Sequence, residues 1–98
     1  MKFMITWQVH KGKIHEALFH FAKMTPAEDK ADIGSQIKLI GRWHDLARGR
    51  GVAICESDSA EAVSNWALNW NGVLDADVAV VLDDKETRAL VKNRAKDC

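Results

Sequence analysis

The hydrophobic periodicity of this chain alternates between strand and helix, and that order constrains the fold more than any other feature. Residues 3–9 alternate apolar and polar side chains, which is typical of a strand with one buried face. From residue 13 the apolar side chains fall at helical spacing: Ile14, Ala17, Leu18 and Phe21. Strands at about 37–44 and 51–57, a helix, a strand at 77–82 and a last helix follow. The first six elements give the β-α-β-β-α-β order of a ferredoxin-like α+β domain, a four-stranded antiparallel sheet with helices on one face.

Local signals predict where the helices begin and end. Asp58 and Asp83 are each followed three residues later by glutamate, as in a capping box, so each is expected to open a helix. Pro26 predicts the end of the first helix, and residues 71–72 (Asn-Gly) predict a left-handed end to the second. The polar segment 25–35, which follows the first helix, is expected to be a mobile loop or a loose helical turn. The last helix is expected to turn two apolar side chains inward: Leu90 and Val91.

The two central strands are expected to form a hairpin in which His44 pairs with Gly51. In that register one face of the hairpin carries Ile37, Leu39, Gly41, Trp43, Val52, Ile54 and Glu56. The other face carries Lys38, Ile40, Arg42, His44, Ala53 and Cys55. Any slip by one residue would change the partners across the ladder, so the positions of these side chains depend on this register.

Several strands carry apolar residues on both faces, as Met4, Ile40 and Val81 illustrate. Two helices cover only one face of a sheet, and an open apolar face would leave a patch of several hundred Å² exposed. The simplest cover is the same face of a second copy, related by a two-fold axis. The sequence therefore predicts one domain over residues 1–98 that forms a homodimer through its sheet.

The charge balance and the cysteines limit the class of protein. Lysine plus arginine number 14 and aspartate plus glutamate number 14, so the zero net charge argues against a general nucleic-acid binder. No apolar run approaches the ~20 residues of a membrane span, and the N-terminus lacks the features of a signal peptide. Cys55 and Cys98 are expected to remain unpaired. These features predict a cytoplasmic protein without nucleic-acid or membrane partners.

Four short motifs resemble a known bacterial family. They are KFMITW at the start, GRWH at 41–44, WALNWN at 66–71 and VLDD at 81–84. Together they look like the family called domain of unknown function 3303, and the resemblance covers nearly the whole chain. That family is grouped with the dimeric α+β barrels, so the resemblance implies two ferredoxin-like protomers that join their sheets. It implies no known reaction, although the wider superfamily includes cofactor-independent oxygenases, haem-degrading enzymes and isomerases.

Arg42 and His44 are the first candidates for a functional site. They are two residues apart on one strand, so their side chains project from the same face. With Glu56 or Cys55 nearby, they could bind an anionic or carbonyl-bearing ligand, and His44 could exchange a proton near neutral pH. The alternative is that both line the polar end of the sheet or the rim of a dimer, paired with Asp45 or Glu56.

Tryptophan is abundant for a chain of this length. Trp7, Trp43, Trp66 and Trp70 could wall a flat pocket between sheet and helices, where each indole N–H offers a hydrogen-bond donor. The alternative is ordinary core packing, since Trp66 and Trp70 lie on the inward stripe of their helix. Both interpretations place these side chains between the layers.

Other chemistry is disfavoured by spacing. The four histidines and two cysteines lack the spacings of a metal site, so neither a metal nor a cofactor is expected. The Arg48–Gly51 loop joins two strands and leads into no helix, so it is expected to be a solvated turn and not a phosphate site. Cys55, inside a strand, is expected to be a buried and inert thiol.

Three hypotheses for the function follow. The first is that the protein binds a small organic molecule between sheet and helices, with Trp7, Arg42, His44 and Glu56 as contacts and Trp66 and Trp70 as walls. The second is a cofactor-independent oxygenase or isomerase in which His44 moves a proton and Arg42 stabilises an oxyanion. The third is an interaction module with a filled core and no site.

Overall fold

The computed structural model describes residues 1–96, and the expected absence of a disulfide to Cys98 lies outside them. Its eight elements, in chain order, are β1 (Lys2–Val9), α1 (Ile14–Lys23), α2 (Pro26–Ile33), β2 (Lys38–Asp45), β3 (Arg50–Glu56), α3 (Ala60–Leu68), β4 (Leu74–Val81) and α4 (Asp84–Lys96). The strands form one antiparallel sheet in the order β2-β3-β1-β4. This is the ferredoxin-like arrangement, so the predicted fold class is confirmed.

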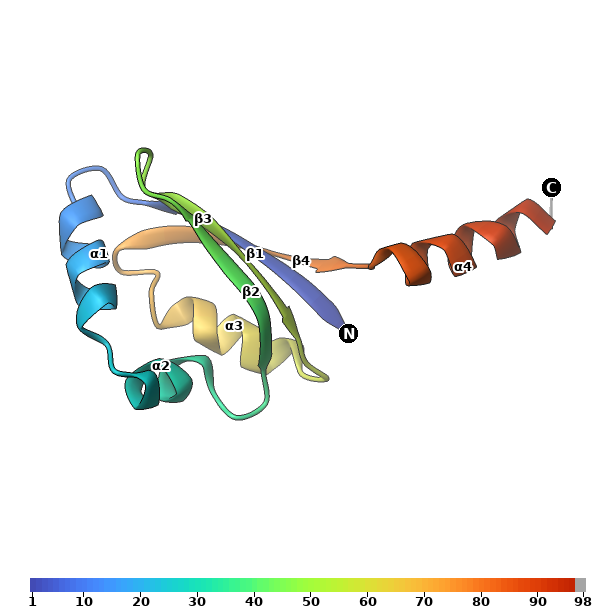
Figure 1. The fold of residues 1–98 in the computed structure, drawn as a ribbon, viewed down its shortest axis with the longest axis horizontal. Helices are drawn as coiled ribbons and strands as arrows, with labels where there is room; N and C mark the ends of the chain where they lie inside the picture. The colour runs from blue at the N-terminus through green and yellow to red at the C-terminus, as the bar shows by residue number, and fades with distance from the viewer. Residues whose placement is uncertain (97–98) are drawn as a thin grey trace.

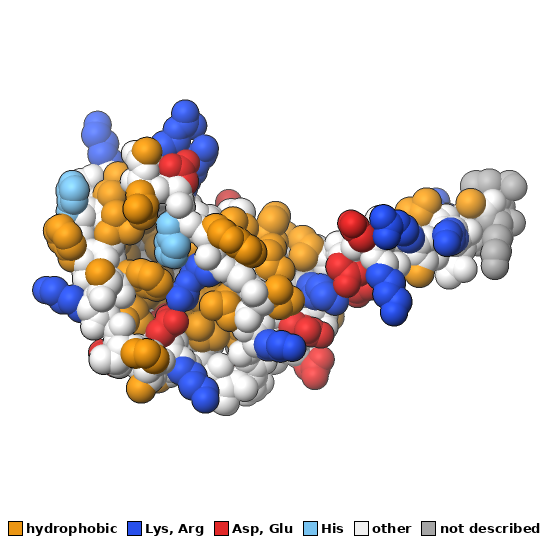
Figure 2. Space-filling view, viewed as in Figure 1, with side chains coloured by type: hydrophobic (Ala, Val, Ile, Leu, Met, Phe, Trp, Pro, Cys, Tyr) orange, Lys and Arg blue, Asp and Glu red, His pale blue; other side chains and the backbone are white. Residues whose placement is uncertain are grey.

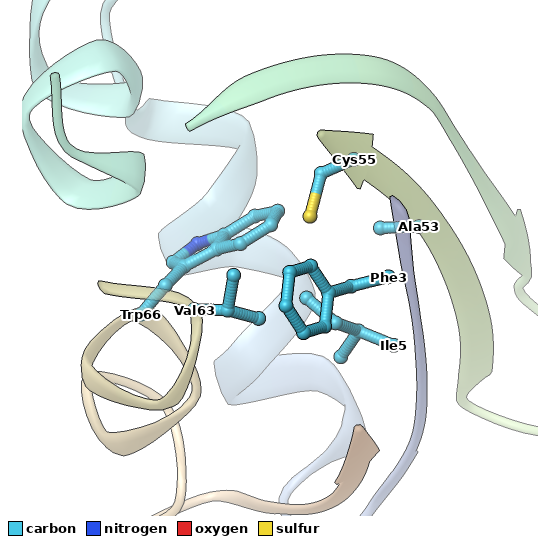
Figure 3. Close-up of a cluster of buried hydrophobic side chains, with 6 residues drawn as sticks. All are labelled: Phe3, Ile5, Ala53, Cys55, Val63 and Trp66. Atoms are coloured by element: carbon cyan, nitrogen blue, oxygen red, sulfur yellow. The ribbon is translucent and has the colours of Figure 1, made fainter. Parts of the chain in front are cut away.

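Helices α1 and α3 pack on one face of the sheet and build the core there (Figure 1). Phe3 and Ile5 of β1 point to this side and are buried, as the alternation in residues 3–9 predicted. They contact Val63 and Trp66 of α3 in the cluster of six side chains drawn in Figure 3. A second cluster joins α1 to the sheet through Val9, Ala17 and Leu74.

The hairpin of β2 and β3 has the predicted pairing of His44 with Gly51. Arg42 therefore pairs with Ala53, and both lie on the face covered by helices. Trp43 pairs with Val52 on the opposite face of the sheet, which we call the outer face. The predicted register of residues 41–44 is thus confirmed, but the expectation that Trp43 lies between the sheet and the helices is wrong.

A β-bulge makes the predicted faces wrong at the start of β2. Between Leu39 and Gly41 the register shifts, so that Ile40 has no partner of its own in β3. The extra residue reverses the alternation. Leu39 therefore pairs with Cys55 and packs against the core together with Ile37, although both had been expected on the same face as Trp43. Ile40 is half exposed, and Lys38, expected with Arg42, instead pairs with Glu56 on the outer face.

The segment 25–35, expected to be a loop or a loose helical turn, contains a capped helix, α2. Thr25 Oγ1 accepts a hydrogen bond from the Glu28 N–H at 3.1 Å, and Glu28 Oε1 accepts one from the Thr25 N–H at 3.1 Å. Pro26 occupies the first turn, where its missing N–H costs nothing. This capping box is readable in the sequence. It was missed because α2 buries no residue and so lacks an apolar stripe.

Two other helix boundaries also differ from the predicted ones. The N-cap of α3 is Ser59, whose hydroxyl accepts from the Ala62 N–H at 3.0 Å, and not Asp58. Gly72 does not have a positive φ, so the predicted left-handed helix end is wrong; α3 ends at Leu68 and a turn leads to β4. The predicted capping box of Asp83 with Glu86 is confirmed, with reciprocal hydrogen bonds of 3.1 and 2.8 Å.

Helix α4 extends away from the other elements (Figure 1). Its first turn is tied to β1, because Lys2 Nζ lies 3.4 Å from an Asp83 carboxylate oxygen and 3.0 Å from a Glu86 one. Leu90 and Val91 are more than half exposed, so the prediction that they point inward is wrong. Among residues 1–96, no helix has both the length and the apolar character needed to cross a lipid bilayer.

Candidate functional site

A cavity of about 80 Å³ lies between the sheet and helices α1 and α3. Its wall includes three tryptophans, Trp7, Trp66 and Trp70, and members of both core clusters. Four alanines contribute to the wall and leave space between the large rings: Ala17, Ala53, Ala67 and Ala76. In Figure 2 hydrophobic side chains lie in the hollow between the helices and the sheet. The volume is several times the ~10–15 Å³ that one water molecule requires.

Trp7 reaches the cavity because its cross-strand partner is Gly51. A Cβ atom added at Gly51 would overlap the indole ring, with Cε2 of Trp7 only 2.7 Å away. The glycine therefore gives the indole room to lie across β3. Because Trp7 is paired with a residue that has no side chain, its ring lies against the sheet and forms this part of the cavity wall.

Arg42 lies in the cavity wall but is held by α2. Its Nη1 and Nη2 donate to the two carboxylate oxygens of Asp29 at 3.2 and 2.9 Å. The side chains are only 16% and 27% exposed, so this bidentate pair is partly shielded from water. The guanidinium carbon also lies 4.7 Å from the centroid of the Phe21 ring, a cation–π contact. Asp29 replaces Asp45 and Glu56, the partners expected from sequence.

His44 is the other polar side chain of the wall. Its ring lies edge-on to Trp7, with the centroids 5.6 Å apart, and 5.1 Å from the centroid of Phe21. Partial burial, and secondly the positive charge of Arg42, lower the pKa of His44 below its ordinary value. At neutral pH the imidazole is therefore uncharged and able to donate or accept a hydrogen bond.

Asp32 of α2 accepts the indole protons of the other two tryptophans. Its Oδ2 lies 3.1 Å from Nε1 of Trp66 and 2.8 Å from Nε1 of Trp70. The amide of Asn69 donates to Asp32 Oδ1 at 3.2 Å and to its backbone oxygen at 3.0 Å. These indole N–H groups had been expected to be available to a ligand. Their use by Asp32 instead fixes the orientation of both rings.

The structure therefore brings together five of the six residues proposed from sequence as ligand contacts: Trp7, Arg42, His44, Trp66 and Trp70. Glu56, the sixth, is exposed on the outer face opposite Lys2 and Lys38. Asp29 and Asp32, which hold Arg42 and two tryptophans of the wall, were not identified from the sequence. Their spacing of three residues on a capped helix could have indicated that they share a face.

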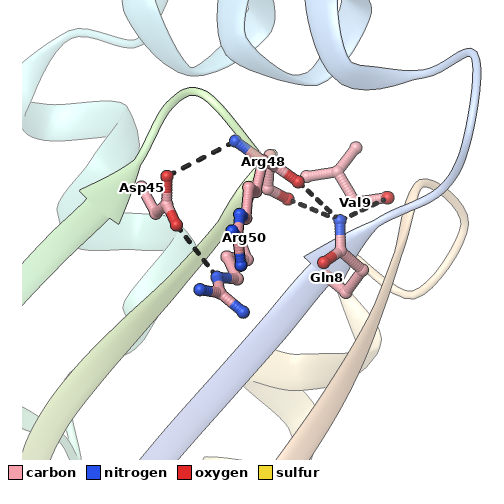
Figure 4. A network of polar contacts seen from close by, with 6 residues as sticks. Gln8, Val9, Asp45, Arg48 and Arg50 are labelled. Atoms are coloured by element: carbon pink, nitrogen blue, oxygen red, sulfur yellow. Dashed lines mark hydrogen bonds and ion pairs between the residues drawn. The ribbon is translucent and has the colours of Figure 1, made fainter.

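The remaining candidates lie away from the cavity. Of the predicted Arg48–Gly51 loop, only Arg48 and Gly49 lie in the hairpin turn, because β3 begins at Arg50. Asp45 accepts from the Arg50 Nε at 2.9 Å, and Gln8 donates to the Arg48 carbonyl at 2.8 Å (Figure 4). Cys55 is fully buried, as predicted, and burial raises the pKa of its thiol. Within residues 1–96 no group of histidine, cysteine and carboxylate side chains has the arrangement of a metal site.

Fold and cavity together define a ferredoxin-like α+β protein with an apolar site between sheet and helices. The family model described as domain of unknown function (DUF3303) matches residues 1–95, and the chain belongs to this family. A crystal structure of an uncharacterized NIPSNAP domain protein from Burkholderia xenovorans is similar, with a TM-score of 0.45 and 14% identity, covering 86% of this chain and 97% of that chain. That similarity is too low to support an inference about function. No curated protein matches the sequence.

Proposed function

We propose that the protein binds a small organic molecule in the cavity between sheet and helices. The observation that carries the proposal is a cavity walled by three tryptophans and four alanines. Protein interiors pack with few voids larger than a water molecule. A ligand that occupies this space gains free energy because it removes apolar surface of the wall from water.

The site is suited to a molecule the size of one aromatic ring. Apolar cavities of about 150 Å³ bind benzene. This cavity of about 80 Å³ is smaller but open to solvent, so a ring would also lie against the exposed side chain of His44. Trp7, Trp66 and Trp70 would contact the ring of the ligand. Arg42 and His44 would lie at its polar end.

Calorimetric titration with phenol tests this proposal. We expect the wild-type chain to bind phenol saturably. Ala17→Leu, which places three more carbon atoms in the cavity, should weaken phenol binding at least tenfold. Ala22→Leu is the matched control, because Ala22 is exposed on the same helix, and it should bind like the wild type. Unsaturable heats with the wild type, or equal affinity in the two variants, would contradict the proposal.

A proton-transfer enzyme is the second candidate, and the lowered pKa of His44 supports it. An uncharged imidazole beside an apolar cavity can act as a general base. The expected role of Arg42 as an oxyanion donor is less well supported, because Asp29 occupies both terminal nitrogens. An enzyme of this kind requires that His44→Gln abolish formation of a product while the protein still binds its substrate.

We also propose that the protein is a homodimer formed through the outer face of the sheet. The middle of that face carries Met4, Thr6, Val52 and Ile54, and Trp43 lies across it over Gly41, 58% exposed. Charged residues of both signs surround this apolar centre, among them Lys2, Lys38 and Glu56. An aromatic anchor inside a polar rim is typical of protein interfaces. A two-fold axis would bring the same patch of a second copy onto it.

Sedimentation analysis of variants at two exposed aromatic residues, Trp43 and Phe19, tests the proposed dimer. Trp43→Glu should shift the wild-type dimer to a monomer, because it buries two unpaired charges across the axis. Phe19→Glu is the control, since Phe19 is exposed on α1, away from the outer face. A monomeric wild type, or a Trp43→Glu variant that stays dimeric, would refute this interface. The proposed location remains the cytoplasm, where a free thiol such as Cys55 stays reduced.

A further inference from the structure

Most polar groups around the cavity are already paired within the protein. The indole N–H groups of Trp66 and Trp70 both donate to Asp32, at 3.1 and 2.8 Å. A ligand could use either N–H only by displacing the Asp32 carboxylate. These two tryptophans therefore offer apolar ring surface and no free hydrogen-bond donor.

Arg42 does not provide a free positive charge either. Asp29 accepts from both of its terminal nitrogens, so the pair has no net charge. A carboxylate ligand beside Arg42 would also lie near the Asp29 carboxylate. It would lose its hydration without gaining an unpaired cation, which is unfavourable in a partly buried site.

Two side chains of the wall, His44 and Trp7, are not paired in this way. His44 contacts Trp7 and Phe21 through ring packing. Within residues 1–96, neither its ring nitrogens nor the indole N–H of Trp7 take part in a hydrogen bond to a protein group. An imidazole can donate from one nitrogen and accept at the other. Its lowered pKa keeps it uncharged at neutral pH, so it would not attract an anion.

From these contacts we infer that the cavity selects uncharged, ring-sized molecules with one hydroxyl or carbonyl group, which hydrogen-bonds to the ring of His44. This inference rests on the proposed binding function and adds the chemical class of the ligand. The apolar part of such a molecule would fill the space left by the alanines. Its single polar group would meet the imidazole of His44, which can both donate and accept a hydrogen bond.

Three molecules of nearly equal size separate the possibilities: toluene, phenol and benzoate. We expect the wild type to bind phenol at least as tightly as toluene, although the hydroxyl of phenol is costlier to desolvate. Benzoate should bind at least tenfold more weakly than phenol. In His44→Phe, toluene affinity should change by less than about threefold, while phenol affinity should fall about tenfold, the value of one hydrogen bond.

The Asp29→Asn variant supplies a second test, because it should gain affinity for benzoate. Removing the carboxylate charge leaves Arg42 as an uncompensated cation at the cavity, so benzoate affinity should rise at least tenfold. Asp45→Asn is the matched control, because Asp45 pairs with Arg50 where β2 and β3 meet their turn, and neither residue lines the cavity. It should leave benzoate affinity unchanged. A melting temperature measured for each variant shows that it is folded.

The outcomes separate this inference from the proposal beneath it. If none of the three molecules binds, the binding function itself is refuted, and the ligand class with it. If His44→Phe weakens the binding of toluene and of phenol equally, the cavity binds aromatic rings but His44 does not select for a polar group. If wild-type protein binds benzoate most tightly, Arg42 is available and the inferred ligand class is wrong.

Discussion

Filling the cavity should stabilise the protein, and the size of the effect follows from the structure. Ala17 is buried on α1 and faces the cavity. Leucine adds three carbon atoms there, which at ~0.8 kcal/mol for each buried CH₂ group gives about 2.4 kcal/mol. Leucine and alanine both favour helices, so propensity changes the result little. We expect Ala17→Leu to raise the free energy of unfolding by up to about 2 kcal/mol.

Urea denaturation at fixed protein concentration measures this change. For a chain of this length, 2 kcal/mol corresponds to a rise in melting temperature of roughly 8–16 °C. The exposed control Ala22→Leu should change the free energy of unfolding by less than about 0.5 kcal/mol. Holding the concentration constant matters because dimerisation would add to the apparent stability.

A destabilised Ala17→Leu variant would refute the reasoning. Overpacking a full core costs about 1–3 kcal/mol. If Ala17→Leu loses that much while Ala22→Leu stays unchanged, the space beside Ala17 is not open to a side chain, and the argument for a ligand there fails. A gain in stability together with lost phenol binding would show that the leucine and the ligand occupy the same space.

Three further perturbations test other parts of the site. Gly51→Ala should cost about 1–3 kcal/mol of stability in urea denaturation because its Cβ overlaps Trp7, whereas Gly72→Ala, with open space around it, should cost less than about 0.5 kcal/mol; equal costs would contradict this packing. Asp32→Ala should destabilise by about 1–3 kcal/mol because two indole donors lose their acceptor, and an unchanged urea midpoint would show that water replaces the carboxylate. The lowered pKa of His44 means that the unfolded chain binds more protons than the native one just below pH 6.5. Stability should therefore fall as the pH drops through that value, and His44→Phe should show a smaller fall; an equal fall in both would contradict this.

The fold was predictable because its signals are local and repeated. The alternation of Phe3, Ile5 and Val9 placed one face of β1 in the core, and the helical spacing from Ile14 identified α1. The bulge at Ile40 was not predictable, because apolar residues occur on both faces of β2 and the pattern is equally compatible with either register. Helix α2 was missed because it buries nothing, even though its capping residues are present.

The candidate site was only partly predictable. Its large side chains were recognisable as an aromatic group on inward positions, and Arg42 and His44 as neighbours on one strand. Their partners Asp29 and Asp32 depend on long-range contacts from α2, which no local pattern specifies. These two unpredicted aspartates change the chemistry of the site, because they neutralise the charge of Arg42 and occupy two indole N–H donors.

The four tryptophans provide the most direct test of the proposed cavity. Each gives one indole N–H signal in a ¹⁵N–¹H correlation spectrum, and Trp43 on the outer face serves as an internal control. The account predicts that phenol shifts the signals of Trp7, Trp66 and Trp70 along one saturable curve and leaves that of Trp43 unchanged. No saturable shift, or a shift confined to Trp43, would contradict the claim that this protein binds a small molecule between its sheet and helices.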